Sequence, residues 1–190
     1  MMPFNIQSFA LNGLAFGGAR PTLFDVQITL PTSFTAGNLD AVQKLQFTCS
    51  ATQLPSSIIG VIDVPYFGRK IKLAGDRVFE DWNVSIMNDE DFLVRDTMES
   101  WHTEINSLAG NLLSTGFDLN TYKASIATIS QYGKDGSTIK QYNMINLFPV
   151  QVGSINVDWN STNTIENFNV TFAYDYWEPV NVASGVTYSL

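Results

Sequence analysis

Residues 55–65 read Pro-Ser-Ser-Ile-Ile-Gly-Val-Ile-Asp-Val-Pro, and the placement of this run decides the fold. Five of its eleven residues are Ile or Val, which favour β-strands, and a proline stands at each end. One hypothesis is a central strand of a β-sandwich. The other is a strand that is buried only when subunits join, because so apolar a strand at an exposed sheet edge promotes aggregation.

The segment after this run is expected to pair with it. Residues 69–74, RKIKLA, alternate basic with apolar side chains and predict a short strand. Gly75 and the aspartate after it predict a turn. We therefore predict a hairpin from Leu54 to Ala74 that makes contacts between subunits, because it combines an apolar run with basic side chains.

Alternation of apolar and polar residues predicts further strands on both sides of this hairpin. Two links, residues 133–136 and 160–163, have compositions typical of hairpin turns. Residues 31–43 are polar and contain Pro and Gly, so we expect a loop there. The other predicted strands are residues 22–30, 44–52, 82–87, 123–132, 137–147, 154–159 and 165–176.

One helix is predicted among these strands. It is expected to begin at a cap formed by Asn88 or Asp89, with acidic residues in its first turn, and to end at Gly110. An apolar stripe recurs at steps of four and three residues, as on the buried face of a helix. The stripe comprises Val94, Met98, Trp101, Ile105 and Leu108.

These elements predict a mainly β protein: a small antiparallel β-sandwich or partly closed β-barrel with one packed α-helix. We divide the chain into an N-terminal arm at residues 1–20, a β-domain at 21–178 and a C-terminal tail at 179–190. The arm carries apolar side chains, among them Phe4 and Phe9. We expect these side chains to pack on their own domain or on a neighbouring subunit.

The composition favours association with copies of the same chain. Charged residues make up 15% of the 190 residues, against about 25% in an average domain. A surface with few charges is most simply explained by burial against other subunits. The net charge of −8 argues against tight binding of nucleic acid, which requires Lys and Arg on the phosphates.

The charges are also segregated along the chain. Arg69, Lys70, Lys72 and Arg77 are four of the ten basic residues, and nine of the eighteen acids lie between residues 76 and 104. From residue 141 onward there is no basic residue. This pattern suits head-to-tail association, in which the basic strip of one subunit meets the acidic face of the next.

Candidate catalytic and metal-binding residues are scarce, so we predict no enzyme, no cofactor and no metal site. The chain has one histidine, His102, and one cysteine, Cys49, which nearly excludes a zinc site with N/S ligands. We interpret His102 as a helix-surface residue and Cys49 as a small core residue. A pair of distant carboxylates, as in glycoside hydrolases, stays open, and so does a carbohydrate-binding module, which many aromatics and asparagines would suit.

The sequence has no apolar run near the ~20 residues that span a membrane. Its N-terminus lacks the basic start and apolar stretch of a secretory signal. We therefore expect the protein to fold in a cytoplasm.

One string of residues resembles a known family. Residues 68–89, GRKIKLAGDRVFEDWNVSIMND, closely resemble the corresponding string of the tail tube proteins of T4-like contractile-tailed phages. Residues 19–24, 49–55 and 172–178 resemble further segments of that family. The resemblance spans about residues 19–178.

The resemblance implies a function for the whole chain. Such proteins form hexameric rings that stack into a tube inside a contractile sheath, between baseplate and tail-terminator proteins. Inner strands of the six subunits join into one β-barrel around an acidic channel, through which the genome passes without specific binding. It implies a virion protein, assembled in the host cytoplasm. A tube or needle protein of a type VI secretion or extracellular contractile injection system is the alternative.

Combined with the residue patterns, this resemblance gives a set of candidate subunit-interface residues. They share a place in the apolar run, the basic strip or the arm. They are Phe4, Phe9, Pro55, Ile58, Ile59, Val61, Ile62, Val64, Arg69, Lys70, Lys72, Asp76 and Arg77.

Overall fold

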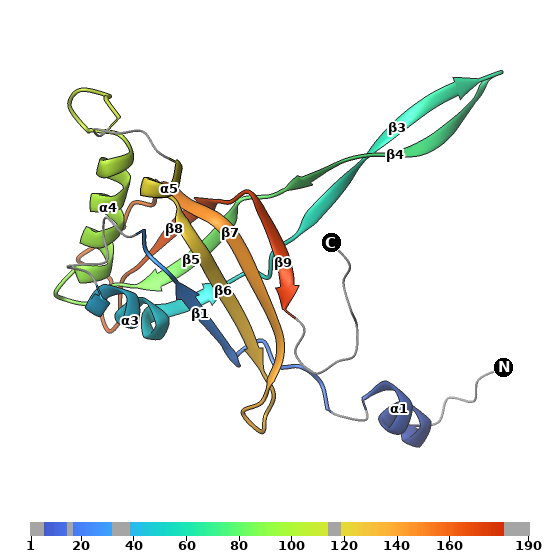
Figure 1. The fold of residues 1–190 in the computed structure, drawn as a ribbon. Coiled ribbons are helices and arrows are strands. Elements are labelled where there is room, and N and C mark those ends of the chain that lie inside the picture. Colours follow the sequence, from blue (N-terminus) through green and yellow to red (C-terminus); the bar gives the residue numbers. More distant parts are fainter. Residues whose placement is uncertain (1–5, 15–16, 32–38, 114–118, 181–190) are drawn as a thin grey trace.

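A computed structural model describes residues 6–14, 17–31, 39–113 and 119–180, and it is mainly β (Figure 1). All strand pairs are antiparallel, as predicted. The elements are α1 (Ile6–Gly13), β1 (Phe24–Ile28), α3 (Leu39–Thr48), β2 (Cys49–Thr52), β3 (Ser57–Tyr66), β4 (Arg69–Phe79), β5 (Trp82–Met87), α4 (Leu93–Ile105), α5 (Leu119–Tyr122), β6 (Ala124–Tyr132), β7 (Thr138–Val152), β8 (Asn167–Ala173) and β9 (Tyr176–Val180).

The long strand β7 belongs to two sheets. Its first part pairs with β6 on one edge and with β9 on the other, and β6 pairs with β1; we call these strands sheet I. Its last part, residues 148–152, pairs with β8, which pairs with β5 and then β2; we call these strands sheet II. The sheets do not close into a barrel, because the strand order ends at β1 and at β2.

The core lies between the two sheets and two helices. Alternation along β5 and β8 turns every second side chain inward, and cross-strand partners such as Val84 and Val170 are fully buried. Trp101 of α4 is also fully buried. Its ring lies tilted against that of Phe172, with centroids 6.2 Å apart, and its indole N–H donates to the carbonyl oxygen of Tyr122 at 2.6 Å. An aromatic side chain with its one polar atom satisfied can fill the core without leaving a buried donor unpaired.

The prediction of a single packed helix is wrong, because α3 packs beside α4. Residues 44–52 were expected to form a strand, yet the chain stays helical to Thr48, and β2 begins only at Cys49. Ala41 and Leu45, four residues apart, both face the core, which is the spacing of a helix. The predicted loop at 31–43 is likewise wrong from Leu39 onward, and residues 32–38 lie outside the described residues.

The predicted start and end of α4 need correction. Phe92 occupies the N-cap position with a φ of 53°, and Asp91 accepts the backbone N–H of Leu93 at 3.1 Å. Asp89 and Asp91 both bind Lys44 of α3, and this contact is the main reason why their pKa values are lowered. The acidic residues before α4 therefore connect α3 to the start of α4 through Lys44. Three predicted stripe residues are buried and Ile105 is partly buried, but Leu108 lies beyond the helix end.

One strand prediction and one turn prediction are also wrong. Residues 154–159 do not form a strand, since β7 ends at Val152 and the following loop leaves Val157 and Trp159 in water. Gly75 and Asp76 do not form a turn, because β4 continues through them to Phe79. The hairpin around residues 133–136 is confirmed by the pairing of β6 with β7.

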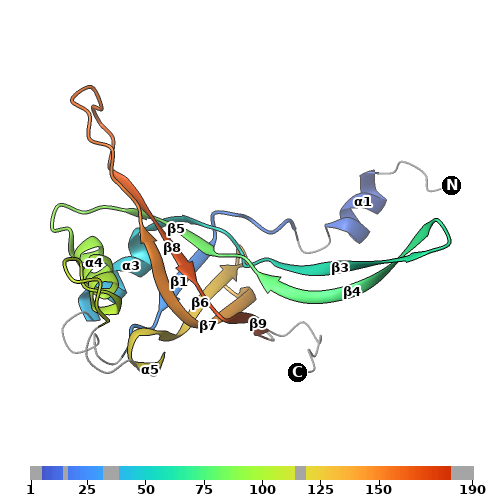
Figure 2. The same ribbon diagram turned by 90° about the horizontal axis from the view of Figure 1, so that it is seen from above.

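The β3–β4 hairpin projects from the body as a two-stranded ribbon, and it pairs with no strand of sheet I or sheet II (Figures 1 and 2). The interpretation of residues 55–65 as a central sandwich strand is therefore wrong. Helix α1 also stands away from the sheets, on the side toward which the hairpin points. In the described part of the chain, no helix is long and apolar enough to cross a membrane.

Candidate assembly interface

The root of the hairpin is fixed to the body. Trp177 of β9 donates its indole N–H to the carbonyl oxygen of Ser56 at 3.0 Å, and its ring lies near Phe79 at the end of β4. Ser56 donates its hydroxyl to Glu80 at 2.6 Å, which bridges the two strands at their base. Because both strands of the hairpin are held at the root in this way, the body of the subunit sets the direction in which the hairpin leaves it.

Cross-strand pairing sorts the side chains of the hairpin onto two faces. Ile62 pairs with Leu73 and Val64 pairs with Ile71, so these four lie on one face. Ile58 and Val78 lie on the same face nearer the root. We call this set the apolar face: Ile58, Ile62, Val64, Ile71, Leu73 and Val78.

None of the described residues of the subunit covers the apolar face. Its six side chains are each between 39% and 59% exposed. A two-stranded hairpin is marginally stable in water by itself and needs a further layer to bury an apolar face. A contiguous exposed patch of this kind marks an interaction site. Of the candidate residues, Ile58, Ile62 and Val64 lie on it.

The opposite face of the hairpin is mixed. It carries Ile59 and Val61, with Arg77 across from Ile59 and Lys72 across from Asp63. Pro65 pairs with Lys70, whose ammonium lies 3.3 Å from the Asp63 carboxylate. The predicted basic strip therefore divides between this face and the tip, where Arg69 lies. Pro55 precedes β3 at the half-buried root.

A bulge separates the outer half of the ribbon from its root. The register shifts between Ile59 and Val61, where Gly75 and Asp76 of β4 oppose a single residue, Gly60. A Cβ on Gly75 would lie 3.1 Å from the carbonyl oxygen of Gly60, so a larger residue there would push the two strands apart by a few tenths of an ångström. The bulge twists the ribbon and exposes Asp76 at its edge.

The tip of the hairpin holds a strained aromatic residue. Phe67 and Gly68 form the two-residue loop with φ values of 42° and 79°, as in a type I′ turn. Asn or Gly normally occupies the first of these positions, because a bulky residue with positive φ is strained. Phe67 is 92% exposed and contacts the ring of Tyr66 edge-on. Burial of the Phe67 ring among the described residues therefore does not offset the strain of its backbone.

The arm places Phe9 in α1, where it is 62% exposed, beside Ile6 and Leu11 at 83% and 72%. Phe4 lies outside the described residues. The structure brings the hairpin candidates together in one element, but it does not bring Phe9 into contact with them in a single subunit.

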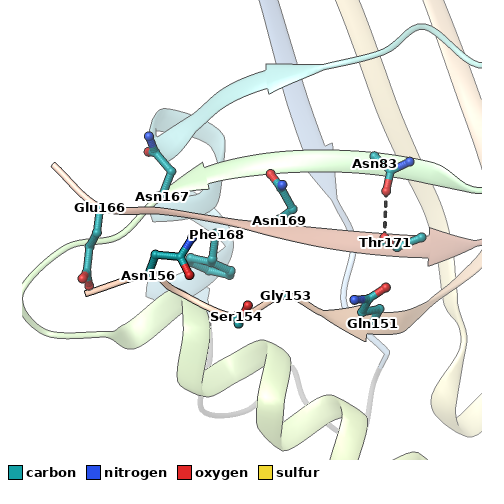
Figure 3. A pocket seen from close by; sticks show the side chains of 10 residues that line it. All are labelled: Asn83, Gln151, Gly153, Ser154, Asn156, Glu166, Asn167, Phe168, Asn169 and Thr171. Atoms are coloured by element: carbon teal, nitrogen blue, oxygen red, sulfur yellow. Dashed lines mark hydrogen bonds between the residues drawn. The ribbon is translucent and has the colours of Figure 1, made fainter. Parts of the chain in front are cut away.

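The outer face of sheet II is polar and was not singled out from the sequence. Asn167, Asn169 and Thr171 of β8 point away from the core, and Thr171 donates its hydroxyl to Asn83 at 2.7 Å (Figure 3). These side chains line an open cavity of about 500 Å³ with Gln151, Ser154 and Asn156. The alternation of asparagine at 167 and 169 was the signal that could have revealed it.

This cavity does not support hydrolysis or sugar stacking. Among the described residues, Glu166 is the one that lines the cavity with a carboxylate, and its Oε1 accepts a hydrogen bond from the side-chain amide of Asn88. A glycoside hydrolase needs two carboxyl groups across its substrate. Phe168 turns its ring into the core, so the cavity also lacks an exposed aromatic platform for a carbohydrate.

The remaining candidates for chemistry have structural roles. The ring nitrogen Nε2 of His102 lies 3.3 Å from the carbonyl oxygen of Val150, so the exposed imidazole joins α4 to β7. Cys49 packs against the core, and burial, with a smaller effect of Asp25, raises its pKa to about 12. Among the described residues, no group of three or more His, Cys, Asp or Glu side chains could hold a metal ion.

Comparison with known proteins identifies the family. A family model for phage tail tube proteins matches residues 19–179. Tail tube protein gp19 of Enterobacteria phage T4 is 41% identical over 162 residues, which cover 84% of this chain and 91% of the phage protein. The chain belongs to the phage tail tube protein family. It is a structural protein, not an enzyme, and tail tube proteins are components of the virion.

Solved structures support the fold of this family member. A chain of the anti-feeding prophage baseplate, 6-fold symmetrised, superposes with a TM-score of 0.59 at 10% identity, covering 87% of this chain and 97% of that one. A chain of the sheath-tube complex of an extracellular contractile injection system, PVC, superposes with a TM-score of 0.57 at 16% identity, covering 94% of this chain and 99% of that one. At these identities the likeness concerns the fold alone.

The apolar face leads to a first prediction. Replacing Ile62 and Ile71 together by serine should leave a folded subunit but abolish polymerisation, because both side chains are exposed in the single subunit. Sedimentation velocity measures the loss of assembly, and circular dichroism checks the fold. Leu108→Ser with Leu112→Ser removes exposed apolar side chains elsewhere and is the control. Normal polymerisation of the hairpin variant would show that this face is not an interface.

The strained tip leads to a second prediction. Phe67→Asn should stabilise the isolated subunit by about 0.5–1 kcal/mol, because Asn tolerates positive φ, and should still weaken assembly at least tenfold. Urea unfolding of the monomer and the critical concentration for assembly measure the two effects. If assembly is unchanged while stability rises, the tip makes no contact with another subunit.

The basic residues lead to a third prediction. Lys70→Glu with Lys72→Glu should raise the critical concentration for assembly at low salt, and the difference from wild type should shrink as salt increases. Light scattering over a salt series measures this. Lys134→Glu, in the exposed β6–β7 turn, is the matched control. A critical concentration unaffected by the hairpin charges at every salt concentration would reject a charged contact between subunits.

Proposed function

We propose that copies of this protein join into hexameric rings that stack into the tube of a contractile phage tail, and that the genome passes through the channel. The observation that carries this proposal is the uncovered apolar face of a hairpin whose root is rigidly held, in a chain of the tail tube family. An element that is incomplete in one subunit becomes complete when a neighbour covers it.

Ring formation has a basis in sheet II. Strand β2 pairs with β5 on one edge and has no second strand partner among the described residues. Joining sheet II to that of a neighbour would satisfy this edge. Four strands from each of six copies, at a spacing of about 4.8 Å, give a barrel about 37 Å across, which leaves room for a DNA duplex. The related baseplate structure is 6-fold symmetrised, which supports the number six.

The partners follow from the same assignment. A sheath around the tube and baseplate and terminator proteins at its ends are proposed by analogy with the sheath-tube complex, the sheath/tube terminator and the baseplate to which chains of similar fold belong. Assembly would take place in the cytoplasm of the host bacterium. The interface candidates proposed here are the hairpin residues and Phe9, with Phe4 as a sequence-based candidate.

A tube of an extracellular contractile injection system is the second candidate, since solved neighbours with this fold come from such systems. The 41% identity to the phage T4 protein favours the phage tail. The genes beside this one would distinguish the two: capsid genes for a phage, effector genes for an injection system.

The proposal predicts that the purified protein forms rings or hollow rods. Negative-stain electron microscopy over a concentration series should show them, with six-fold symmetry in end-on views. The serine variant of Ile62 and Ile71 is the negative control. A lone compact particle at high concentration, under every condition of salt and pH, would contradict the proposal.

A further inference from the structure

The loop between β7 and β8 projects from the body on the side away from the hairpin (Figure 2). It holds three large apolar side chains in water: Val157, Trp159 and Ile165 are 85%, 102% and 69% exposed. The other three tryptophans of the chain are buried or half-buried, which is the habit of this residue. We call residues 153–166 the tryptophan loop.

Both ends of the tryptophan loop are fixed to sheet II. At its start, the N–H of Gly153 donates to the carbonyl oxygen of Asn169 at 2.7 Å. At its end, Glu166 accepts the backbone N–H of Asn88 at 2.9 Å. Ile155, between them, packs against the core. The body of the subunit therefore sets the direction in which the loop points.

A hydrogen-bonded turn carries Trp159 at the end of the loop. The carbonyl oxygen of Asp158 accepts the N–H of Ser161 at 3.0 Å, which places Trp159 at the second position of a β-turn. The Asp158 carboxylate also accepts the backbone N–H of Asn160 at 3.0 Å, and an aspartate stabilises the start of a turn in this way. Because the turn is already formed, burying Trp159 against a partner requires little further ordering of the chain.

The tryptophan loop and the hairpin leave sheet II at opposite ends of the same strands. In the pairing of β5 with β8, Trp82 lies across from Phe172 next to the hairpin root. At the other end, Met87 lies across from Asn167 next to the loop. The strand from Asn167 to Phe172 spans about 17 Å. When sheets join edge to edge into a ring, the strand ends lie on the two faces of the ring, so the hairpin lies on one face and the loop on the other.

Resting on the stacked rings proposed above, we propose that the tryptophan loop is the docking site for the hairpin of the next ring, with Trp159 packed on the apolar face of that hairpin. Two different surfaces meet in such a contact, so every copy offers one of them at each end. A heterologous contact of this kind repeats head to tail without limit, as a tube requires.

The two surfaces are complementary in hydrophobicity and in charge. Each has an apolar centre that no described residue of its own subunit covers. The tryptophan loop contains Asp158 and Glu166 but no basic residue, whereas Arg69, Lys70 and Lys72 lie in the outer half of the hairpin. A central tryptophan with charged groups around it is the usual composition of a binding hot spot and its polar rim.

Tryptophan fluorescence tests whether the loop is buried on assembly. Trp159→Phe keeps an aromatic ring and removes one emitter, so the difference between wild type and this variant reports on Trp159. Acrylamide should quench this difference signal strongly in dissociated subunits and about tenfold less in tubes, because a hot-spot side chain is desolvated in its interface. Equal quenching in the two states would overturn the proposal. Absence of wild-type tubes would instead count against the proposed function, so the two failures are distinguishable.

Cross-linking tests which surface covers the loop. A chain with Ser161→Cys, next to Trp159 in the turn, and Leu73→Cys, on the apolar face, is assembled into tubes and treated with a short bismaleimide. A contact between rings should give a ladder of covalent products that continues past the size of one ring. The matched control, Ser161→Cys with Ser100→Cys on α4, should give no ladder. Wild type gives the background, which should be low because Cys49 has a raised pKa.

Products that stop at the size of one ring would place the contact within a ring and overturn the proposal. Cross-links confined to single chains, or no cross-link at all, would overturn it as well. A small maleimide that labels both cysteines in dissociated subunits checks that each thiol is accessible.

Discussion

A two-stranded β-ribbon has no third strand and no second layer, so its apolar side chains stay in water unless another molecule covers them. In this chain the β3–β4 ribbon carries six such side chains on one face, all outside the core. Trp177 and Ser56 hold the root, so the ribbon points away from the body (Figure 1). The folded subunit therefore presents an incomplete element, and association with a copy of itself is the simplest way to complete it.

The ribbon and sheet II are connected directly through the chain. Strand β3 follows β2 and β4 leads into β5, so the chain leaves sheet II along one strand of the ribbon and returns to it along the other. Contacts made by the hairpin are thereby transmitted to the sheet edge at which neighbours in a ring would join. Sheet I and the helices stiffen this sheet from its other side, through the core around Trp101 and Phe172.

The sequence predicted the strand-rich fold, the main helix and the hairpin, because period and turn residues are local signals. Local signals could not predict which strands pair with one another or which elements pack together. Alternation at 154–159 predicted a strand, but no neighbouring strand is there to pair with it. Leu45, Phe47 and Cys49 alternate as in a strand, and this pattern outweighed the helical spacing of Ala41 and Leu45, the two residues that pack α3 on the core. The polar cavity on the outer face of sheet II was missed because only Asn167 and Asn169 of β8 signal it locally, while its other residues come from separate segments.

Hydrogen exchange tests the central claim most directly, because it reports on each backbone amide in the single subunit and in the assembled tube. The account predicts that amides of residues 57–79 exchange rapidly in dilute subunits and at least a hundredfold more slowly in tubes, while amides in the middle of β8, already paired on both edges, change little. Equal exchange of the hairpin amides in the two states would contradict it.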